Sequence, residues 1–332
     1  MPEQGAVDLS AVGLRRLVTQ VAGLLEDAGV PSPRHDAEAL VAWCLGLPRL
    51  EWVRLPATGV VVPDDDAPRF LAELAEAVER RRSREPLQRI VEHAVFRHVT
   101  VRVVDDVFVP RPETETVAQL AVDEAARLVA ERAGTDVAGP LVVDLCCGSG
   151  VIAISVDVEV PGARVVAVDS SEAAVRATAA NAAAVGSGTQ RTLLGDVRDP
   201  ALLGELDGTV DVLVSNPPYI PPDAVPREPE VRDHDPDLAL YGGGADGLAV
   251  PGAVVRAAAR LLAPGGLFVM EHAEVQATAV RALVEATGVL LDARTVPDLT
   301  GRPRAVVARR AAGTNPANRR TATADGVGDW AP

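Results

Sequence analysis

Short apolar runs alternate with helical segments between residues 141 and 271, and this alternation restricts the possible fold most strongly. The runs are Leu141–Leu145, Arg164–Asp169, Arg191–Leu194, Val210–Ser215 and Gly266–Glu271, and a closing pair, Val289–Val296 and Arg304–Arg309, follows them. Strands that alternate with helices form a mostly parallel sheet with helices on both faces, because each crossover between parallel strands needs a helix. The pattern therefore predicts an α/β fold with a doubly wound sheet.

Two regions of different character precede this pattern. Residues 1–84 carry apolar side chains at helical spacing, with a break near Pro31, and predict a small helical bundle. Residues 85–112 follow, and within them Val95–Val103 alternates apolar and polar side chains. We expect this segment to be a β-hairpin linker with its turn at Asp105-Asp106.

The remaining boundaries follow from the same patterns. A helix opening at Glu113 or Thr114 begins the main domain, which we place at residues 113–310. Residues 311–332 contain Gly, Asn, Thr and Asp without an apolar period, which predicts a disordered tail.

The composition limits the classes of partner and compartment. The net charge of −15 opposes general nucleic-acid binding, because affinity for nucleic acid comes largely from neutralising phosphates. The three cysteines, two of them adjacent, fit neither a disulfide framework nor a CxxC metal site. No signal peptide or membrane-spanning run is present, so we expect a soluble, cytoplasmic protein without a membrane partner.

The ends of the first three strands predict a nucleoside-binding site. The first strand is followed by Cys146-Cys147-Gly148-Ser149-Gly150, whose glycines permit close backbone approach to a ligand at a helix N-terminus. Asp169 ends the second strand and can accept hydrogen bonds from both ribose hydroxyls. Asp196, with Val197 beside it, ends the third strand, where its carboxylate can accept a hydrogen bond from an adenine amino group. Since Ala153 completes a dinucleotide fingerprint, NAD and S-adenosylmethionine both remain open at this point.

The fourth strand ends in Asn216-Pro217-Pro218-Tyr219, which has unusual chemistry for a loop. The Asn216 side-chain carbonyl and the Pro217 backbone carbonyl are acceptors, while proline removes backbone donors. Two acceptors beside the aromatic ring of Tyr219 can hold a planar –NH2 group. A tight turn with a packed tyrosine is the simpler interpretation. Because nothing specifies a nicotinamide pocket, the tetrapeptide favours S-adenosylmethionine and methyl transfer to nitrogen.

The chain resembles the protein-(glutamine-N5) methyltransferases of the HemK/PrmC type, which act on the glutamine of the Gly-Gly-Gln motif in peptide chain release factors. The resemblance covers nearly all of Leu9 to Arg309, including Phe108–Glu115, the glycine loop, Asn216–Pro221, Pro229–Arg232, Gly243–Leu248 and Leu299–Arg304. Asn-Pro-Pro-Tyr alone is shared with DNA adenine and RNA guanine methyltransferases, whereas Arg111–Glu115 and the insertion Pro229–Leu248 are much more specific. It implies the class I methyltransferase fold, a Rossmann-like seven-stranded sheet with an antiparallel last strand. It also implies that the helical domain docks the protein substrate.

The resemblance implies roles for named residues. Asn216, Pro217 and Tyr219 would be catalytic and, with Pro218, would bind the substrate amide. Cofactor contacts would come from Asn216 and from the nucleoside-site residues Cys146, Cys147, Gly148, Ser149, Gly150, Asp169, Asp196 and Val197. No metal is expected.

Two segments depart from the family pattern. Gly-Thr is common where this chain has Cys146-Cys147, and a cysteine disfavours a left-handed backbone at position 146. We expect these cysteines to pack beneath the loop rather than to act in redox or metal chemistry. Glu271-His272-Ala273 replaces the commoner Glu-Ile-Gly, and we expect His272 to be structural rather than part of the pocket.

Three alternative functions stay open. A sister class of enzyme methylates a glutamine of a large-subunit ribosomal protein and shares the catalytic loop. A nucleic-acid exocyclic-amine methyltransferase is disfavoured by the net charge of −15. A nucleotide-binding module without catalysis is disfavoured by the presence of Asn216, Tyr219 and Asp169. We expect a monomer with release factors as its protein partners and S-adenosylmethionine as its cofactor.

Overall fold

The computed structural model describes residues 11–47, 49–50 and 66–312. It divides into two compact units, Met1–His93 with Pro226–His234, and Ala94–Val225 with Asp235–Pro332. The predicted tail, apart from residues 311 and 312, lies outside the described residues, as does Leu9, where the first helix was expected to begin. Within the described ranges, no helix is long and apolar enough to cross a membrane.

The first unit is helical, as its sequence predicts. Its helices are α1 (Ala11–Asp27), α2 (Pro33–Cys44), α3 (Ala67–Arg82), α4 (Leu87–Ile90) and α8 (Pro229–Arg232). The spacing of apolar residues on α1 to α3 buries one side of each helix in a common core that includes Leu14, Leu40 and Phe70. α8 comes from a distant stretch of sequence and belongs to this unit because Glu230 accepts hydrogen bonds from Arg81 and Arg84, at 2.8–2.9 Å.

The second unit is built on a seven-stranded sheet with the order β5-β4-β3-β6-β7-β9-β8. The strands are β3 (Leu141–Leu145), β4 (Arg164–Asp169), β5 (Arg191–Leu194), β6 (Val210–Ser215), β7 (Leu262–Glu271), β8 (Leu290–Pro297) and β9 (Pro303–Arg310). β3 to β7 pair in parallel, and β9 lies antiparallel between β7 and β8. The predicted doubly wound sheet with an antiparallel last strand is confirmed.

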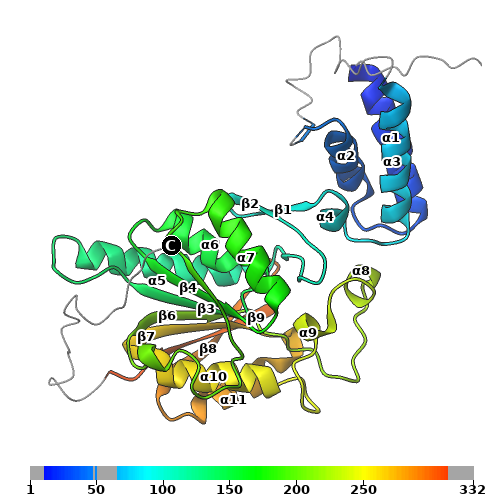
Figure 1. The fold of residues 1–332 in the computed structure, drawn as a ribbon. Helices are drawn as coiled ribbons and strands as arrows, with labels where there is room; N and C mark the ends of the chain where they lie inside the picture. The colour runs from blue at the N-terminus through cyan, green and yellow to red at the C-terminus, as the bar shows by residue number, and fades with distance from the viewer. Residues whose placement is uncertain (1–10, 48, 51–65, 313–332) are drawn as a thin grey trace, which may run out of the picture. The chain divides into compact units, whose positions relative to one another are not determined.

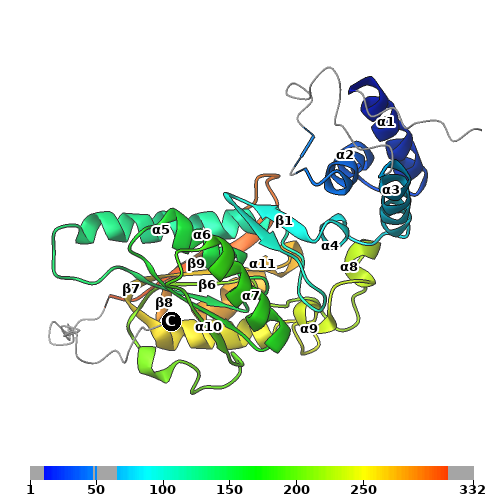
Figure 2. The ribbon, with the colours of Figure 1, turned by 45° about the horizontal axis from the view of Figure 1, so that its top comes forward.

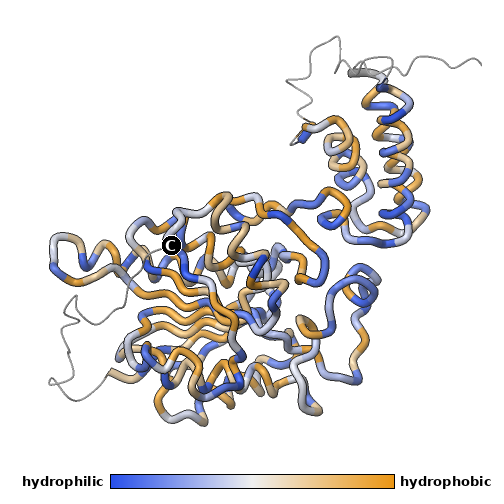
Figure 3. The backbone as a smooth tube through the Cα atoms, viewed as in Figure 1, coloured by the Kyte–Doolittle hydropathy of each residue, from blue (hydrophilic) through white to orange (hydrophobic). Residues whose placement is uncertain are grey.

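Helices cover both faces of this sheet (Figures 1 and 2). α5 (Thr114–Arg132), α6 (Val151–Glu159) and α7 (Glu172–Val185) lie on one face, and α10 (Ala249–Leu261) and α11 (Ala277–Glu285) lie on the other. Alternate strand residues enter two separate cores, so that Val142 packs with α5 and α6 whereas Val143 packs with α10. Hydropathy colouring accordingly shows the strands as the most apolar part of the unit (Figure 3).

The linker hairpin forms, but the expected position of its turn is wrong. β1 (His93–Phe96) and β2 (Val99–Arg102) make a two-stranded sheet that turns at Arg97-His98, and residues 107–109 are not a strand. Arg97 takes a positive φ of 50°. Its backbone N–H donates to Glu115 at 3.0 Å, and its guanidinium pairs with Glu159 at 2.7 Å. These contacts fix the turn at Arg97, which strand periodicity alone cannot locate.

The shorter elements complete the second unit. They are the 3-10 turns η1 (Gly204–Leu206) and η2 (Glu274–Gln276) and the helix α9 (Asp237–Leu240). An isolated parallel bridge joins Ile220 to Tyr241, so the segment after β6 is connected to the residues that follow α9.

Candidate active site

The carboxyl ends of five parallel strands meet at one edge of the sheet. In the strand register Leu145 lies opposite both Val168 and Ser215, and Ser215 lies opposite Met270. The loops that follow these strands are therefore neighbours, at the edge where open α/β sheets bind ligands.

The glycine loop between β3 and α6 is held from below by α7. Thr178 donates to the Gly148 carbonyl at 2.8 Å, and Asn181 donates to the Ser149 carbonyl at 3.0 Å. Gly150 has a φ of +85°, and a Cβ atom there would lie 2.8 Å from the Thr178 methyl group. A Cβ on Gly148 would meet no atom within 4 Å, so the loop presents open backbone on its outer side.

Cys146 corrects one expectation, since it adopts a left-handed backbone with a φ of 60° although it is not glycine. The loop geometry therefore imposes the conformation, at a cost of about 1–2 kcal/mol for a side chain with a Cβ. Cys147 is buried, with its Sγ 3.5 Å from the Thr178 hydroxyl. Burial, reinforced by nearby Asp144 and Asp169, raises the pKa of Cys147 well above its ordinary value, so this thiol stays neutral.

Asp169 lies directly beneath the glycine loop. Its carboxylate accepts from the Gly148 N–H and from the Ser171 N–H, each at 2.9 Å. Burial raises the pKa of Asp169, and these two hydrogen bonds, which lower it, only partly offset the rise. Each oxygen keeps a further lone pair that a hydroxyl group can reach.

Asp196 is more exposed, and Arg198 occupies its carboxylate with a hydrogen bond of 2.6 Å. That hydrogen bond lowers the pKa of Asp196. Asp196 and Arg198 line a cavity of about 330 Å³ with Ser170, Leu194, Gly195 and Leu238. The cavity lies between the ends of β4 and β5, where the sequence places the adenine, and Val197 follows Asp196 in the chain.

Asp144 is a candidate site residue that the sequence analysis missed. It is fully buried in β3, its Oδ2 accepts from the Ala153 N–H at 3.1 Å, and its Oδ1 has no hydrogen-bond partner among the residues that the structure describes. Burial raises the pKa of Asp144 to about 8, and the nearby charge of Asp169 adds to the rise. The sequence could have pointed to Asp144, because it is an acidic residue inside an otherwise apolar strand and such residues are rarely buried without a partner.

The segment Asn216–Tyr219, the acceptor loop, follows β6 as predicted. The Asn216 Nδ2 donates to the Thr114 hydroxyl at 3.2 Å. Among the described residues, neither Oδ1 of Asn216 nor the Pro217 carbonyl accepts a hydrogen bond. The two acceptors that the sequence analysis identified are therefore available for hydrogen bonds from a ligand.

The acceptor loop is fixed at Tyr219 from two directions. The Tyr219 hydroxyl donates to Oε1 of Glu271 at 3.3 Å, and Gln276 donates to the Tyr219 carbonyl at 2.7 Å. Gln276 also donates to the Asp246 carbonyl at 3.0 Å, which joins this loop to the glycine-rich segment before α10. Gly247 belongs to that segment, and a Cβ there would lie 2.3 Å from the Tyr219 carbonyl oxygen. The loop is therefore held in place by its surroundings.

His272 is fully buried, as expected for a structural residue. Its Nδ1 lies 2.8 Å from the Ala273 carbonyl, and within the described ranges its Nε2 has no hydrogen-bond partner. Burial lowers the pKa of His272. Within the described parts of the chain, no group of three His, Cys, Asp or Glu side chains could hold a metal ion.

These residues fit S-adenosylmethionine. The open backbone at Gly148 allows a ligand to approach closely, and the unpartnered oxygen of Asp144 is an acceptor beneath the loop. The Asp144 carboxyl is buried and the Asp169 carboxyl is half-buried. Two acidic groups at this site suit a positively charged ligand better than the phosphates of a dinucleotide.

Comparisons with known proteins identify the family of this chain. The family descriptions "PrmC N-terminal domain" and "Methyltransferase small domain" match residues 16–91 and 115–226. A release factor glutamine methyltransferase from Streptomyces coelicolor is 44% identical over 89% of this chain and 97% of that protein. The chain belongs to the release factor glutamine methyltransferase family. The family prediction and the class I methyltransferase fold are both confirmed.

Other members of this family and one different enzyme are also similar. A release factor glutamine methyltransferase from Mycobacterium tuberculosis is 41% identical over 90% of this chain and 91% of that protein. A 4-amino-L-phenylalanine/4-methylamino-L-phenylalanine methyltransferase from Streptomyces pristinaespiralis is 47% identical, over 64% of this chain and 69% of that protein. The second relative shows that an arylamine methyltransferase can share much of this sequence.

Proposed function

We propose that this protein transfers a methyl group from S-adenosylmethionine to the side-chain amide nitrogen of the glutamine in the Gly-Gly-Gln motif of release factors. The observation that carries the proposal is the pair of free acceptors, Asn216 Oδ1 and the Pro217 carbonyl, fixed beside Tyr219. The similarity to release factor enzymes over almost the whole chain supports the choice of substrate.

An amide nitrogen is a weak nucleophile, because its lone pair is delocalised into the carbonyl. Asn216 Oδ1 and the Pro217 carbonyl would each accept one N–H of the glutamine amide, which orients the nitrogen and raises its electron density. The Tyr219 ring would lie against the amide plane. Bound S-adenosylmethionine supplies an electrophilic methyl group on a positive sulfonium. The methylated nitrogen is strongly acidic, so its proton can leave without a dedicated base.

The cofactor would be held by the glycine loop (146–150) and Asn216, with Asp169 at the ribose and Asp196 and Val197 at the adenine. The adenine amino group would have to share the Asp196 carboxylate with Arg198 or displace it. The helical unit would dock the release factor. The substrate implies a cytoplasmic reaction, and we propose that the enzyme acts as a monomer.

A small arylamine is the second candidate substrate, because the arylamine methyltransferase is 47% identical to this chain. That similarity covers 64% of the chain, whereas the similarity to a release factor enzyme covers 89%. The match of residues 16–91 to a PrmC N-terminal domain favours the protein substrate.

The test uses labelled S-adenosylmethionine with the full-length protein. The substrates are a release factor, its Gly-Gly-Ala variant, the large-subunit ribosomal protein, 4-aminophenylalanine and DNA. We expect label on the native release factor alone. Label on 4-aminophenylalanine or the ribosomal protein, with none on the release factor, contradicts the proposal.

A further inference from the structure

The buried face of α7 carries two polar side chains where alanine would otherwise pack. Its buried residues are alanines except for Thr178 and Asn181, which are 0% and 3% exposed. The two lie three residues apart, so both side chains project from the same face of the helix. Threonine and asparagine form helices less readily than alanine and lose hydration when they are buried. Their hydrogen bonds must therefore offset a cost that alanine would not have.

Both side chains hold the glycine loop. Thr178 donates to the Gly148 carbonyl at 2.8 Å, and Nδ2 of Asn181 donates to the Ser149 carbonyl at 3.0 Å. The Gly148 N–H donates to the Asp169 carboxylate at 2.9 Å. Two successive carbonyls of the loop are thus turned toward α7, and the loop is fixed before a ligand arrives.

Asn181 also holds the linker hairpin, at the last residue of β2. Its Oδ1 accepts from the Arg102 N–H at 2.9 Å, and its Nδ2 donates to the Arg102 carbonyl at 3.1 Å. These partners determine the orientation of the amide, because a backbone N–H can only donate and a carbonyl can only accept. The two N–H groups of Asn181 are therefore divided between the hairpin and the glycine loop.

We propose that Asn181 is a positioning residue that connects the glycine loop to the linker hairpin and so fixes the loop in the conformation that binds the cofactor. This inference rests on the proposed function, in which the glycine loop holds S-adenosylmethionine. Three elements far apart in sequence meet at this one amide, namely β2, the loop after β3, and α7. A disturbance of the hairpin at Arg102 should therefore reach the glycine loop.

A positioning role and a purely structural role have different consequences. Replacement of a buried, fully hydrogen-bonded asparagine lowers stability in either case. A loosened loop must in addition be ordered by its ligand, so it binds the ligand less tightly. Once the cofactor is bound the loop is ordered again, and the reacting nitrogen lies at the acceptor loop. Positioning thus predicts weaker cofactor binding with nearly unchanged kcat at saturating cofactor.

The experiment measures the Kd of S-adenosylmethionine by calorimetry in the full-length protein, with kcat at saturating cofactor. N181A and N181D should each raise Kd about tenfold, the effect of losing one well-placed hydrogen bond, while kcat changes less than about twofold. T178V removes the neighbouring hydrogen bond to the same loop and should also raise Kd. Wild-type Kd in both Asn181 variants would overturn the proposal.

The matched control is D157N, which changes a buried side chain near the other end of α6. Asp157 accepts from the Ser187 N–H and hydroxyl, each at 2.6 Å, and so holds the loop that follows α7. D157N should lower the melting temperature and leave Kd unchanged. A rise of Kd in D157N equal to that in N181A would mean that lost stability alone weakens binding, and would overturn the proposal.

A double-mutant cycle tests the connection to the hairpin. R97A removes the guanidinium that pairs with Glu159 and loosens the turn of the hairpin. It should raise Kd about threefold in the wild type and have no further effect in N181A, where the connection is already lost. An equal effect of R97A in both backgrounds would overturn the connection.

Hydrogen exchange of the Arg102 backbone amide supplies a readout that needs no cofactor. N181D keeps an oxygen that accepts from this N–H but loses the donors to both carbonyls, whereas N181A loses every contact. Exchange should therefore be slow in the wild type and N181D and fast in N181A. Equally slow exchange in N181A would contradict the proposal. If the wild type fails to bind S-adenosylmethionine, the proposed cofactor site fails, while this exchange pattern still tests the role of Asn181.

Discussion

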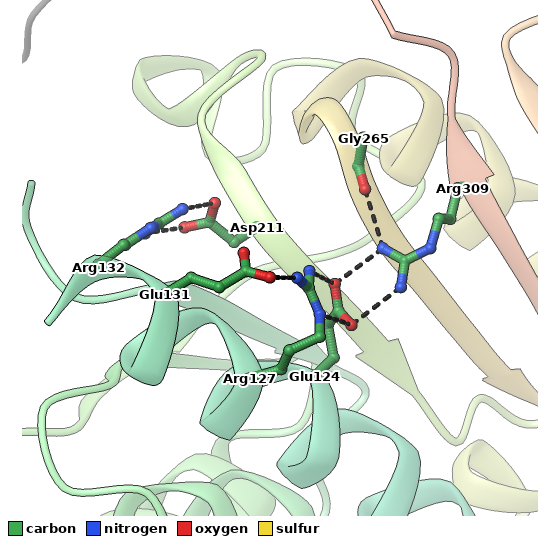
Figure 4. Close-up of polar contacts among 7 residues, drawn as sticks. All are labelled: Glu124, Arg127, Glu131, Arg132, Asp211, Gly265 and Arg309. Atoms are coloured by element: carbon green, nitrogen blue, oxygen red, sulfur yellow. Dashed lines mark hydrogen bonds and ion pairs between the residues drawn. The ribbon is translucent and has the colours of Figure 1, made fainter.

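The carboxylates of Glu124 and Asp211 at the amino edge of the sheet lie against arginines, whereas among the described residues those of Asp144 and Glu271 at the carboxyl edge make no hydrogen bond to an arginine. At the amino edge Glu124 accepts from Arg127 and Arg309, and Asp211 accepts from Arg132 (Figure 4). At the carboxyl edge Asp144 and Glu271 each keep an oxygen without a hydrogen-bond partner in the described part of the chain. α5 joins the two edges, since Thr114 begins it beside Asn216 and Arg132 ends it beside Asp211.

The pKa values show the same contrast. Burial raises the pKa of Glu124, but hydrogen bonds from Arg309 and Arg127 outweigh it and lower the pKa to about 2. Asp144 and Glu271 are shifted in the opposite direction, to about 8 and about 7. Glu124 is thus held in ion pairs at the amino edge, whereas Asp144 and Glu271 at the carboxyl edge are desolvated groups that a ligand can satisfy. Such a contrast is expected at a binding site, because a ligand needs polar groups whose hydrogen bonds are not already made within the fold.

The largest effect on activity is expected at the acceptor loop. N216A should lower kcat about 10²-fold, because it removes an oriented acceptor that acts on the reacting nitrogen. Among the described residues, the Asn216 side chain makes one hydrogen bond, to Thr114, so the melting temperature should change little, and the Kd of S-adenosylmethionine should change far less than kcat. Steady-state methylation of a release factor, with calorimetry for the cofactor, measures both. Near-full methylation by N216A would falsify the mechanism.

The corresponding change at the amino edge should affect stability alone. E124Q weakens four hydrogen bonds from Arg127 and Arg309 and should lower the free energy of unfolding by about 2 kcal/mol. Urea unfolding measures this loss, and kcat of the folded protein should match the wild type. A fall in kcat at a temperature where E124Q is fully folded would contradict the separation of the two edges.

The pH dependence of this loss has a definite sign. Since the pKa of Glu124 is lowered from 4.5 to about 2, its stabilisation is fully present above pH 4.5 and disappears as the pH falls toward 2. The difference in unfolding free energy between wild type and E124Q should therefore shrink across that range.

Asp144 should show the opposite dependence. Its pKa rises from 3.8 to about 8, so ionisation opposes folding and stability falls as the pH increases between these values. D144N removes the charge while its side-chain oxygen can still accept from Ala153, and should stabilise the protein by about 1 kcal/mol at pH 8. The Kd of S-adenosylmethionine should increase, because a cation loses a nearby carboxylate. A D144N protein that is less stable than the wild type at pH 8 would show that Asp144 is a structural residue.

The sequence predicted the sheet and the ligand edge well because both follow from local patterns. The central strands β3, β4 and β6 are mostly apolar, and the glycine loop, Asp169 and Asn216 lie at or directly after their carboxyl ends. The turn of the hairpin and the hydrogen bond between Asn216 and Thr114 could not be predicted in this way. Both depend on contacts between residues far apart in sequence, such as Arg97 with Glu159 and Thr114 with Asn216. Glu271 was visible in the sequence, but its burial beside Tyr219 was not.

The smallest effect tests the strained backbone at the carboxyl edge, with two adjacent cysteines as a matched pair. Cys146 has a φ of 60°, whereas Cys147 is not among the described residues with positive φ. C146G relieves about 1–2 kcal/mol of strain but increases the entropy of the unfolded chain by about 0.5–1 kcal/mol, so a gain of about 0.5 kcal/mol is expected. C147G relieves no such strain and loses the packing of a buried side chain, so it should destabilise the protein by about 1 kcal/mol. Thermal unfolding of both variants, compared with the wild type, should give opposite signs. The same sign in both would mean that packing of the thiols, rather than backbone conformation, decides the stability of this loop.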